Sequence, residues 1–212
     1  MATLQSSDPG ADHVPPQYTG SEMNAVEKIE LPSELEAIHF FKTVKERLLD
    51  INSWSHFAGE AMSIFRLTDS SGNEVNRKAT DGDYIKIDIP GPGPSTGQGF
   101  DWVVIEDIRS QLFDDAEVLS ITVRPASNPA SDKESTAHFL TDEATSTFQV
   151  KRLVNIITAE EHGRNEMANT DTESVLDNIR NTFVGLGAKL GFSYPQWKSL
   201  VKGLLNNESA YK

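Results

Sequence analysis

The spacing of hydrophobic residues first predicts a helix near the N-terminal end of this 212-residue chain. From about residue 33 to residue 50, apolar side chains recur at every third or fourth position, which is typical of an amphipathic helix. These are Leu35, Ile38, Phe41, Val44 and Leu48. Ser33 and Glu36 form an S-x-x-E capping box at the start of this pattern. We expect the helix to end between Asp50 and Trp54.

The hydrophobic period then changes to two, which is typical of strands whose faces differ in polarity. The clearest case is Tyr84 to Ile89, where three isoleucines share one face while a lysine and an aspartate share the other. We expect strands at residues 61–67, 84–89, 102–108, 119–123, 137–141, 147–153 and 156–162. Because short turns and no helices separate them, they predict an antiparallel sheet of six or seven strands.

Helical spacing returns near the C-terminal end. Thr170 and Glu173 offer a second capping box, and an apolar stripe continues from there to Leu186. Glycines at positions 185, 187 and 191 weaken the end of that helix. Ser193 and Pro195 are typical of a new helix start. The apolar face of this last helix holds Trp197, Leu200, Val201, Leu204 and Leu205. The pattern predicts one broken helix or two short helices.

The chain therefore divides into an arm and one domain. Residues 1–31 are rich in Ser, Pro, Gly, Asp and Glu without an apolar period, so we expect a disordered or loosely packed arm. A docking tail for a partner is the alternative. Residues 32–212 are expected to form a single α+β domain, in which the N-terminal and C-terminal helices flank the antiparallel sheet and cover one of its faces.

Composition narrows the classes of function. The formal net charge is −13 and the pI is about 4.7, so we expect no nucleic-acid partner, because such binding relies on Lys and Arg. The chain has no cysteine, which removes disulfides and a thiol nucleophile. The first residues do not resemble a secretory signal, and no apolar run reaches the ~18 residues of a membrane helix. We expect a cytoplasmic protein without a membrane partner.

The stretch IPGPGPSTGQGFDW, Ile89 to Trp102, resembles a phosphate-binding loop only superficially. No lysine follows its glycines, three prolines remove backbone N–H donors, and a strand rather than a helix comes next. We interpret it as a stiffened, exposed connection between two strands. If a loop of this protein contacts a ligand or a partner, the expected contacts are Pro92, Ser95, Thr96 and Gly99.

The sequence contains acidic residues near two histidines but no signature of catalysis. His162 lies near Glu160, Glu161 and Glu166, and His138 precedes Asp142. Neither group has a specific spacing of metal ligands, and no nucleophile motif is present. We therefore assign no catalytic residue, no metal and no cofactor, and we expect a protein that is not an enzyme. A metal-dependent or carboxylate-dependent hydrolase remains open.

Four further residues are candidates for contacts with a ligand or a partner. Trp54, Trp102 and Trp197 lie at the end of the first helix, at the start of an inner strand and in the last helix. They either pack in the core or line a cavity between sheet and helices. Arg164, at the end of the last strand, either pairs with a carboxylate or faces a ligand.

This order of elements resembles the helix-grip arrangement of START and Bet v 1-like proteins. The resemblance covers roughly residues 33–206 and rests on element order, with a broken C-terminal helical region as a departure. It implies a cavity between a curved sheet and a helix that holds a small apolar ligand. The composition favours a non-catalytic binding module for a protein partner or for self-association. Binding of a small apolar ligand is the alternative.

Overall fold

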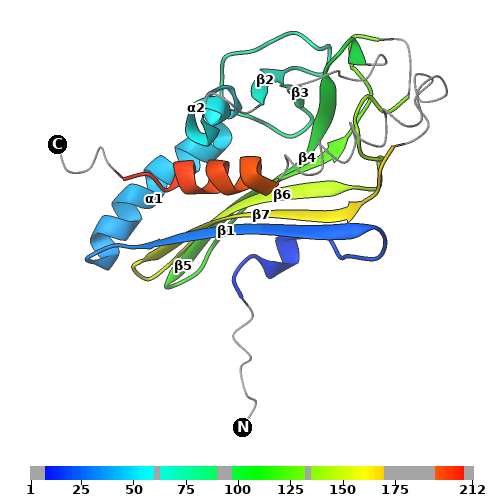
Figure 1. The fold of residues 1–212 in the computed structure, drawn as a ribbon. Coiled ribbons are helices and arrows are strands. Elements are labelled where there is room, and N and C mark those ends of the chain that lie inside the picture. The colour runs from blue at the N-terminus through cyan, green and yellow to red at the C-terminus, as the bar shows by residue number, and fades with distance from the viewer. Residues whose placement is uncertain (1–7, 60–62, 90–96, 132–134, 170–193, 208–212) are drawn as a thin grey trace.

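The computed structural model describes residues 8–59, 63–89, 97–131, 135–169 and 194–207. Its described part is an α+β fold built on one antiparallel sheet of seven strands in the order β1-β7-β6-β5-β4-β3-β2 (Figure 1). The strands are β1 (Ser21–Glu30), β2 (Ile64–Thr68), β3 (Tyr84–Asp88), β4 (Asp101–Leu112), β5 (Ala116–Pro125), β6 (Thr145–Leu153) and β7 (Ile156–Glu166). Strands β2 to β7 form a continuous meander, and β1 pairs with β7.

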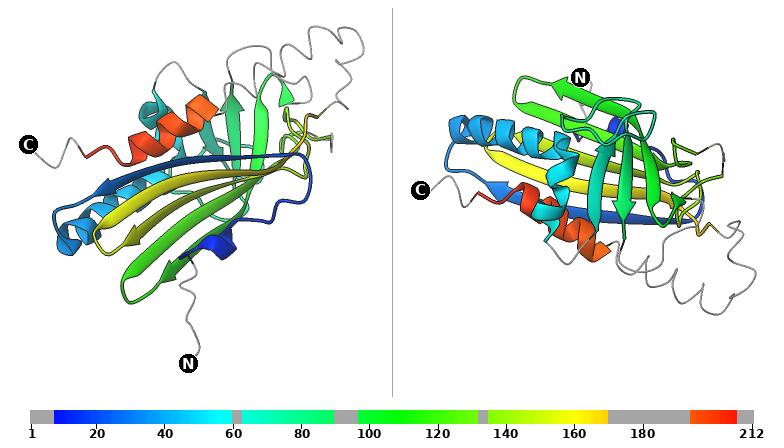
Figure 2. Two further views of the ribbon diagram at one scale, coloured as in Figure 1. Left: turned by 60° about the horizontal axis from the view of Figure 1, so that its bottom comes forward. Right: turned by 90° about the horizontal axis from the view of Figure 1, so that it is seen from above.

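Helices cover one face of the sheet, which we call the inner face. Helix α1 (Glu34–Leu49), the short helices η2 (Ile51–Ser53) and α2 (Trp54–Ala58), and a helix at residues 194–204 lie on this side. The sheet curves around α1, and the helix at 194–204 lies alongside β1 (Figure 2). The hydrophobic core lies between these layers, as a sheet with one apolar face requires. This agrees with the helix-grip element order that we expected.

The first helix forms largely as predicted. The Ser33 hydroxyl accepts a hydrogen bond from the Glu36 backbone N–H at 3.3 Å and so caps the helix. Its buried stripe consists of Ala37, Phe41, Val44 and Leu48, whereas Leu35 is 63% exposed. The prediction that Leu35 faces the core is therefore wrong, because in the first turn the core-facing position is Ala37.

The expectation of a disordered or loosely packed arm is wrong for Ser21–Glu30. This segment is the edge strand β1, paired with β7 from Ser21 to Glu30, so the sheet begins before residue 32. Its inner positions alternate through Ala25 and Ile29, but Glu27 interrupts the alternation. That carboxylate pairs with Lys198 of the 194–204 helix at 2.8 Å, a partner invisible to local periodicity.

The segment preceding β1 lies on the outer face of the sheet. It includes the single 3₁₀ turn η1 (Ala11–His13). His13 is buried, and its Nδ1 atom lies 2.7 Å from the hydroxyl of Ser120. The Gln149 side chain donates a hydrogen bond to the Gly10 carbonyl at 2.9 Å. Residues 8–13 therefore belong to the folded structure.

The strand predicted at residues 137–141 is also wrong. The backbone there bonds to scattered partners: the Ala137 N–H donates to Ala126 O, and the Trp102 N–H donates to Ala137 O. Leu140 makes an isolated bridge with Ala168. The apolar alternation in this segment reflects burial against the ends of neighbouring strands, without a continuous ladder. The sheet still has seven strands because β1 supplies the seventh.

The last helix agrees with the prediction at residues 194–204, where Leu200, Val201 and Leu204 are buried. The helix expected after Thr170 falls in residues 170–193, outside the described part of the chain. Within the described residues, no helix is both long enough and apolar enough to cross a membrane.

Candidate functional site

A cavity of about 50 Å³ lies between the inner face of the sheet and the helices. Its walls come from strands β2 to β6, from the end of β7, from α2 and from the helix at 194–204. One water molecule requires roughly 10–15 Å³ on this scale, so the cavity has room for only a few molecules of that size. A larger molecule therefore requires the lining to move.

Four aromatic rings pack together on one side of this cavity. Trp54 contacts Phe148 at a centroid distance of 4.6 Å and Phe65 at 5.6 Å. Trp197, from the 194–204 helix, contacts Phe148 at 5.0 Å and Phe65 at 5.8 Å. The Trp54 indole N–H donates to the Leu48 carbonyl at 3.0 Å, which fixes that ring. The group provides an apolar wall with aromatic faces.

Polar groups interrupt this apolar lining where β2 meets the last helix. The Ser63 backbone N–H donates to the side-chain oxygen of Gln196 at 3.1 Å. The Ser63 hydroxyl is buried, and no described group lies within hydrogen-bonding distance of it. His138 lines the cavity as well, and its Nδ1 atom accepts the Leu140 N–H at 3.0 Å, so that nitrogen is unprotonated.

Two glutamates of β7 add carboxyl groups to the inner side of the sheet. Glu161 pairs across the ladder with Phe148, so both side chains lie on the inner face. It is fully buried, and neither carboxyl oxygen makes a hydrogen bond of standard geometry within the described residues, although the Ser146 side chain lies near enough to favour ionisation. Burial, followed by the nearby Glu166 carboxylate, raises the pKa of Glu161 well above its ordinary value. Glu166 lines the cavity, and burial raises its pKa too.

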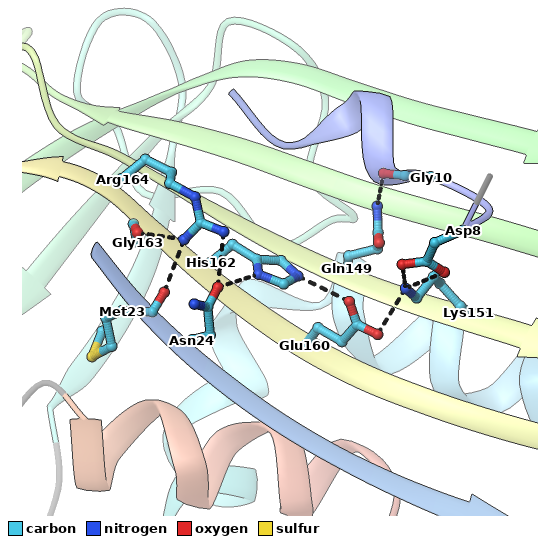
Figure 3. Close-up of polar contacts among 10 residues, drawn as sticks. All are labelled: Asp8, Gly10, Met23, Asn24, Gln149, Lys151, Glu160, His162, Gly163 and Arg164. Carbon is cyan, nitrogen blue, oxygen red and sulfur yellow. Dashed lines mark hydrogen bonds and ion pairs between the residues drawn. The ribbon is translucent and has the colours of Figure 1, made fainter. Parts of the chain in front are cut away.

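A second polar group of residues lies on the outer face (Figure 3). Glu160 lies 2.9 Å from both the Lys151 ammonium and His162 Nε2, and Lys151 also pairs with Asp8. Burial opposes ionisation of Glu160, but His162 and Lys151 outweigh it and lower the pKa of this carboxyl. His162 Nδ1 lies 2.7 Å from the side-chain oxygen of Asn24. These contacts link β1, β6 and β7 to Asp8, and each of the side chains named here has its partner within the group.

Arg164 belongs to this outer group and not to the cavity. Its guanidinium donates to the Met23 carbonyl at 3.1 Å and to the Asn24 side-chain oxygen at 2.8 Å (Figure 3). It therefore bridges β7 to β1 through neutral acceptors, which is neither the carboxylate pairing nor the contact with a ligand that the sequence left open. The described residues contain no group of three or more His, Cys, Asp or Glu side chains arranged to hold a metal ion.

Of the remaining predicted contact residues, some line the cavity and others do not. Trp54 and Trp197 line the cavity, as the cavity alternative expects. Trp102 does not: its neighbour Val103 lines the cavity, so Trp102 points to the other face, where its indole N–H donates to the Gly97 carbonyl. Pro92, Ser95 and Thr96 lie outside the described residues. Gly99 has a φ of 90°, which a glycine adopts readily, and lies in open space.

In the sequence, Glu161 and Glu166 drew attention only as acidic neighbours of His162. A usable signal exists within β7 itself. The inner positions of this strand are Ile157, Ala159, Glu161 and Gly163, so a carboxyl interrupts the apolar phase. A charged residue in the buried phase of an inner strand is rare without a partner, and it marks a candidate site.

No family model and no curated protein matches this sequence. Comparison with solved structures finds a hypothetical protein of Helicobacter pylori, with a TM-score of 0.45, 11% identity, and 86% of this chain and 87% of that chain covered. Norcoclaurine synthase from Thalictrum flavum has a TM-score of 0.38 and 9% identity, with 91% of this chain and 99% of that chain covered. Ara h 8.0201 has a TM-score of 0.36 and 9% identity, with 88% of this chain and 100% of that chain covered. With TM-scores below 0.5 and such identities, these likenesses assign neither a ligand nor a reaction to this chain.

Proposed function

We propose that this protein binds a small apolar ligand between the inner face of the sheet and the helix at residues 194–204. The observation that supports this most strongly is the cavity bounded by the four aromatic side chains, with unpartnered polar groups beside it. Ligand sites in proteins combine such an apolar lining with a few placed polar groups. A dry structural core would instead be expected to leave neither a void nor unpaired polar atoms.

The size of the cavity sets the mode of binding. At about 50 Å³ it is much smaller than the ~300–1,000 Å³ of sites for drug-sized ligands. Small aromatic compounds are therefore the ligands to test first. Trp197 is half-buried and belongs to a single helix, whereas Trp54 and Phe65 are almost completely buried. We therefore expect Trp197 to move when a ligand enters.

Binding of benzyl alcohol, a neutral aromatic probe, tests this proposal by titration with intrinsic tryptophan fluorescence and by native mass spectrometry. Val123→Phe fills the cavity from β5, whereas Val118→Phe places the same added volume on the opposite face of the same strand. Both changes overpack buried sites and are expected to destabilise the fold by about 1–3 kcal/mol. Only Val123→Phe should abolish binding. Equal loss in both variants, or no binding to the wild type, would refute the proposal.

Self-association or docking to a protein partner is a second candidate function. It is favoured by exposed apolar side chains at two adjoining turns, Leu112 and Phe113 after β4 and Leu153 and Val154 after β6. The turns are joined by a hydrogen bond from the Val154 N–H to the Asp115 carbonyl at 2.8 Å. Light scattering on the wild type and on a Leu112→Ser, Phe113→Ser variant tests self-association. A monomer in both cases rules out self-association.

A further inference from the structure

We propose that the ligand of this cavity carries a cationic group, such as a primary amine on an aromatic body, and that Glu161 and Glu166 bind this group. The inference rests on the proposed function and specifies its ligand class. It starts from a feature that packing does not explain: two carboxyl groups on the inner side of β7, that of Glu166, which lines the cavity, and that of Glu161, which is fully buried and makes no hydrogen bond of standard geometry within the described residues.

The backbone of β7 brings the two carboxyl groups together. Glu161 and Gly163 are successive inner positions of the strand, because side chains alternate between faces. The Glu166 carboxyl lies over Gly163: its Oε1 atom is 2.6 Å from the position that a Cβ atom on that glycine would occupy. A side chain at position 163 would therefore displace Glu166. The absence of one leaves the two carboxyl groups adjacent on the cavity side of β7.

No described cation neutralises this pair from the inner side. The titratable side chains that line the cavity are Glu166 and His138. Arg164 weakly favours ionisation of both glutamates, but its guanidinium is bonded to β1 on the outer face. Lys198, on the helix that covers the cavity, pairs with Glu27 and with the Val26 carbonyl at the sheet edge. The inner carboxyl groups thus lack a counter-ion in the described part of the chain.

An organic cation satisfies both parts of this site. An ammonium group supplies hydrogen-bond donors and a positive charge to carboxylate oxygens that otherwise have only neutral hydroxyl groups nearby, those of Ser146 and Ser21. The aromatic faces of Trp54, Phe148 and Trp197 attract a cation through their ring quadrupoles and also pack against an apolar body. An anionic ligand would meet the repulsion of two carboxyl groups, and a neutral one would leave any ionised carboxylate unpaired.

Three probes of similar shape and different charge test the inference on the full chain. Benzylamine, benzyl alcohol and benzoate are titrated at pH 7 by isothermal calorimetry. We expect benzylamine to bind at least about tenfold more tightly than benzyl alcohol, because a charged hydrogen bond corresponds to about ten- to a hundredfold in affinity. Benzoate should bind least. Glu166→Gln should remove most of the preference for benzylamine, whereas Glu160→Gln, on the outer face of the same strand, should retain it.

The pH dependence gives a readout independent of any variant. The affinity for benzylamine should increase as pH rises through the range in which Glu161 and Glu166 ionise, while the amine stays charged. His138 and Arg164 are the other titratable groups near this pair, and His138→Gln serves as a control that should leave the trend unchanged. An affinity that is flat or falls with pH overturns the inference.

The outcomes separate this inference from the proposed function. Binding of benzyl alcohol without any preference for benzylamine overturns the cationic ligand and retains the apolar site. Tighter binding of benzoate does the same. Failure of all three probes to bind refutes the proposed function and this inference together. If Glu166→Gln does not fold, the wild-type order of affinities and its pH dependence decide the question.

Discussion

Replacement of Glu161 by methionine should make this protein more stable. Glu161 is completely buried on the inner face, opposite Phe148, and both its oxygens lack partners among the described residues. An unsatisfied buried polar group costs about 1–3 kcal/mol, and an unbranched thioether of similar length fills the same space. We therefore expect the free energy of unfolding of Glu161→Met to exceed that of the wild type by about 1–3 kcal/mol. For a domain of this size that corresponds to roughly 2–4 °C in Tm per kcal/mol.

The assay is urea denaturation at a series of pH values, with Glu160→Met as the matched control. Glu160 is the next residue but faces outward and pairs with Lys151 and His162. Its loss should destabilise the fold by up to about 3–5 kcal/mol, because it leaves the nearly buried Lys151 ammonium with only the exposed carboxylate of Asp8 as a partner. Equal destabilisation in both variants would refute the reasoning, since it would show that Glu161 makes a stabilising contact.

The sign of the pH effect sharpens this prediction. Burial raises the pKa of Glu161, so the folded protein holds a proton that the unfolded chain releases. The stability associated with that proton is complete below the ordinary pKa of a glutamate and is lost as pH rises through the raised folded value. The wild type should therefore lose stability relative to Glu161→Met as pH rises. A difference between the two that does not change with pH would contradict a buried protonated carboxyl.

Two further substitutions test the packing of the helix at residues 194–204 and the ion pair between Arg77 and the buried Asp83. Gly203→Ala should lower the free energy of unfolding, measured in urea, by about 1–3 kcal/mol, because the new Cβ atom would lie 2.1 Å from the Phe57 carbonyl oxygen. This loss is expected although alanine normally favours a helix. Lys202→Ala, at the exposed neighbouring position, should change the free energy of unfolding by less than about 0.5 kcal/mol. Burial opposes ionisation of Asp83, but two hydrogen bonds from Arg77, at 2.6 and 2.8 Å, together with those from the Thr80 backbone N–H and hydroxyl, outweigh it and lower the pKa of this carboxyl. The stability that ionised Asp83 provides is present above about pH 4 and is lost as pH falls through the lowered pKa. Asp83→Asn should therefore lower the free energy of unfolding by about 1.5–3 kcal/mol at pH 7 and should flatten the acid side of the curve of stability against pH. Unchanged acid unfolding in Asp83→Asn would count against this assignment.

The elements that could be predicted are those whose signal is local. Helix α1 and strands β2 to β7 each bury an apolar face, so apolar residues recur at a period that a short window reveals. Strand β1 was missed because it lies at the sheet edge and its inner phase contains Glu27. The charge that makes Glu27 acceptable there comes from Lys198, on the last helix. Pairings of this kind are not visible to local periodicity.

The residues of the candidate site could likewise be predicted only in part from the sequence. Trp54 and Trp197 were identified as cavity candidates because large aromatic side chains on apolar faces must lie in the core or line a cavity. Which of the three tryptophans share a cavity depends on strand phase, and Trp102 lies on the opposite face from Val103. Arg164 looked equally suited to a ligand until its partners on β1 were known.

The periods of the apolar residues were enough to predict the class of the fold, although they missed β1 and indicated a strand at 137–141 that does not form. Only the tertiary structure decided that β1 closes the sheet beside β7 and that the helix at residues 194–204 covers its inner face. It also decided that Glu161 is buried without a partner while its neighbour Glu160 has two. Hydrophobic periodicity is set by neighbours along the chain, whereas the charge balance of a buried site is set by segments that meet only after folding.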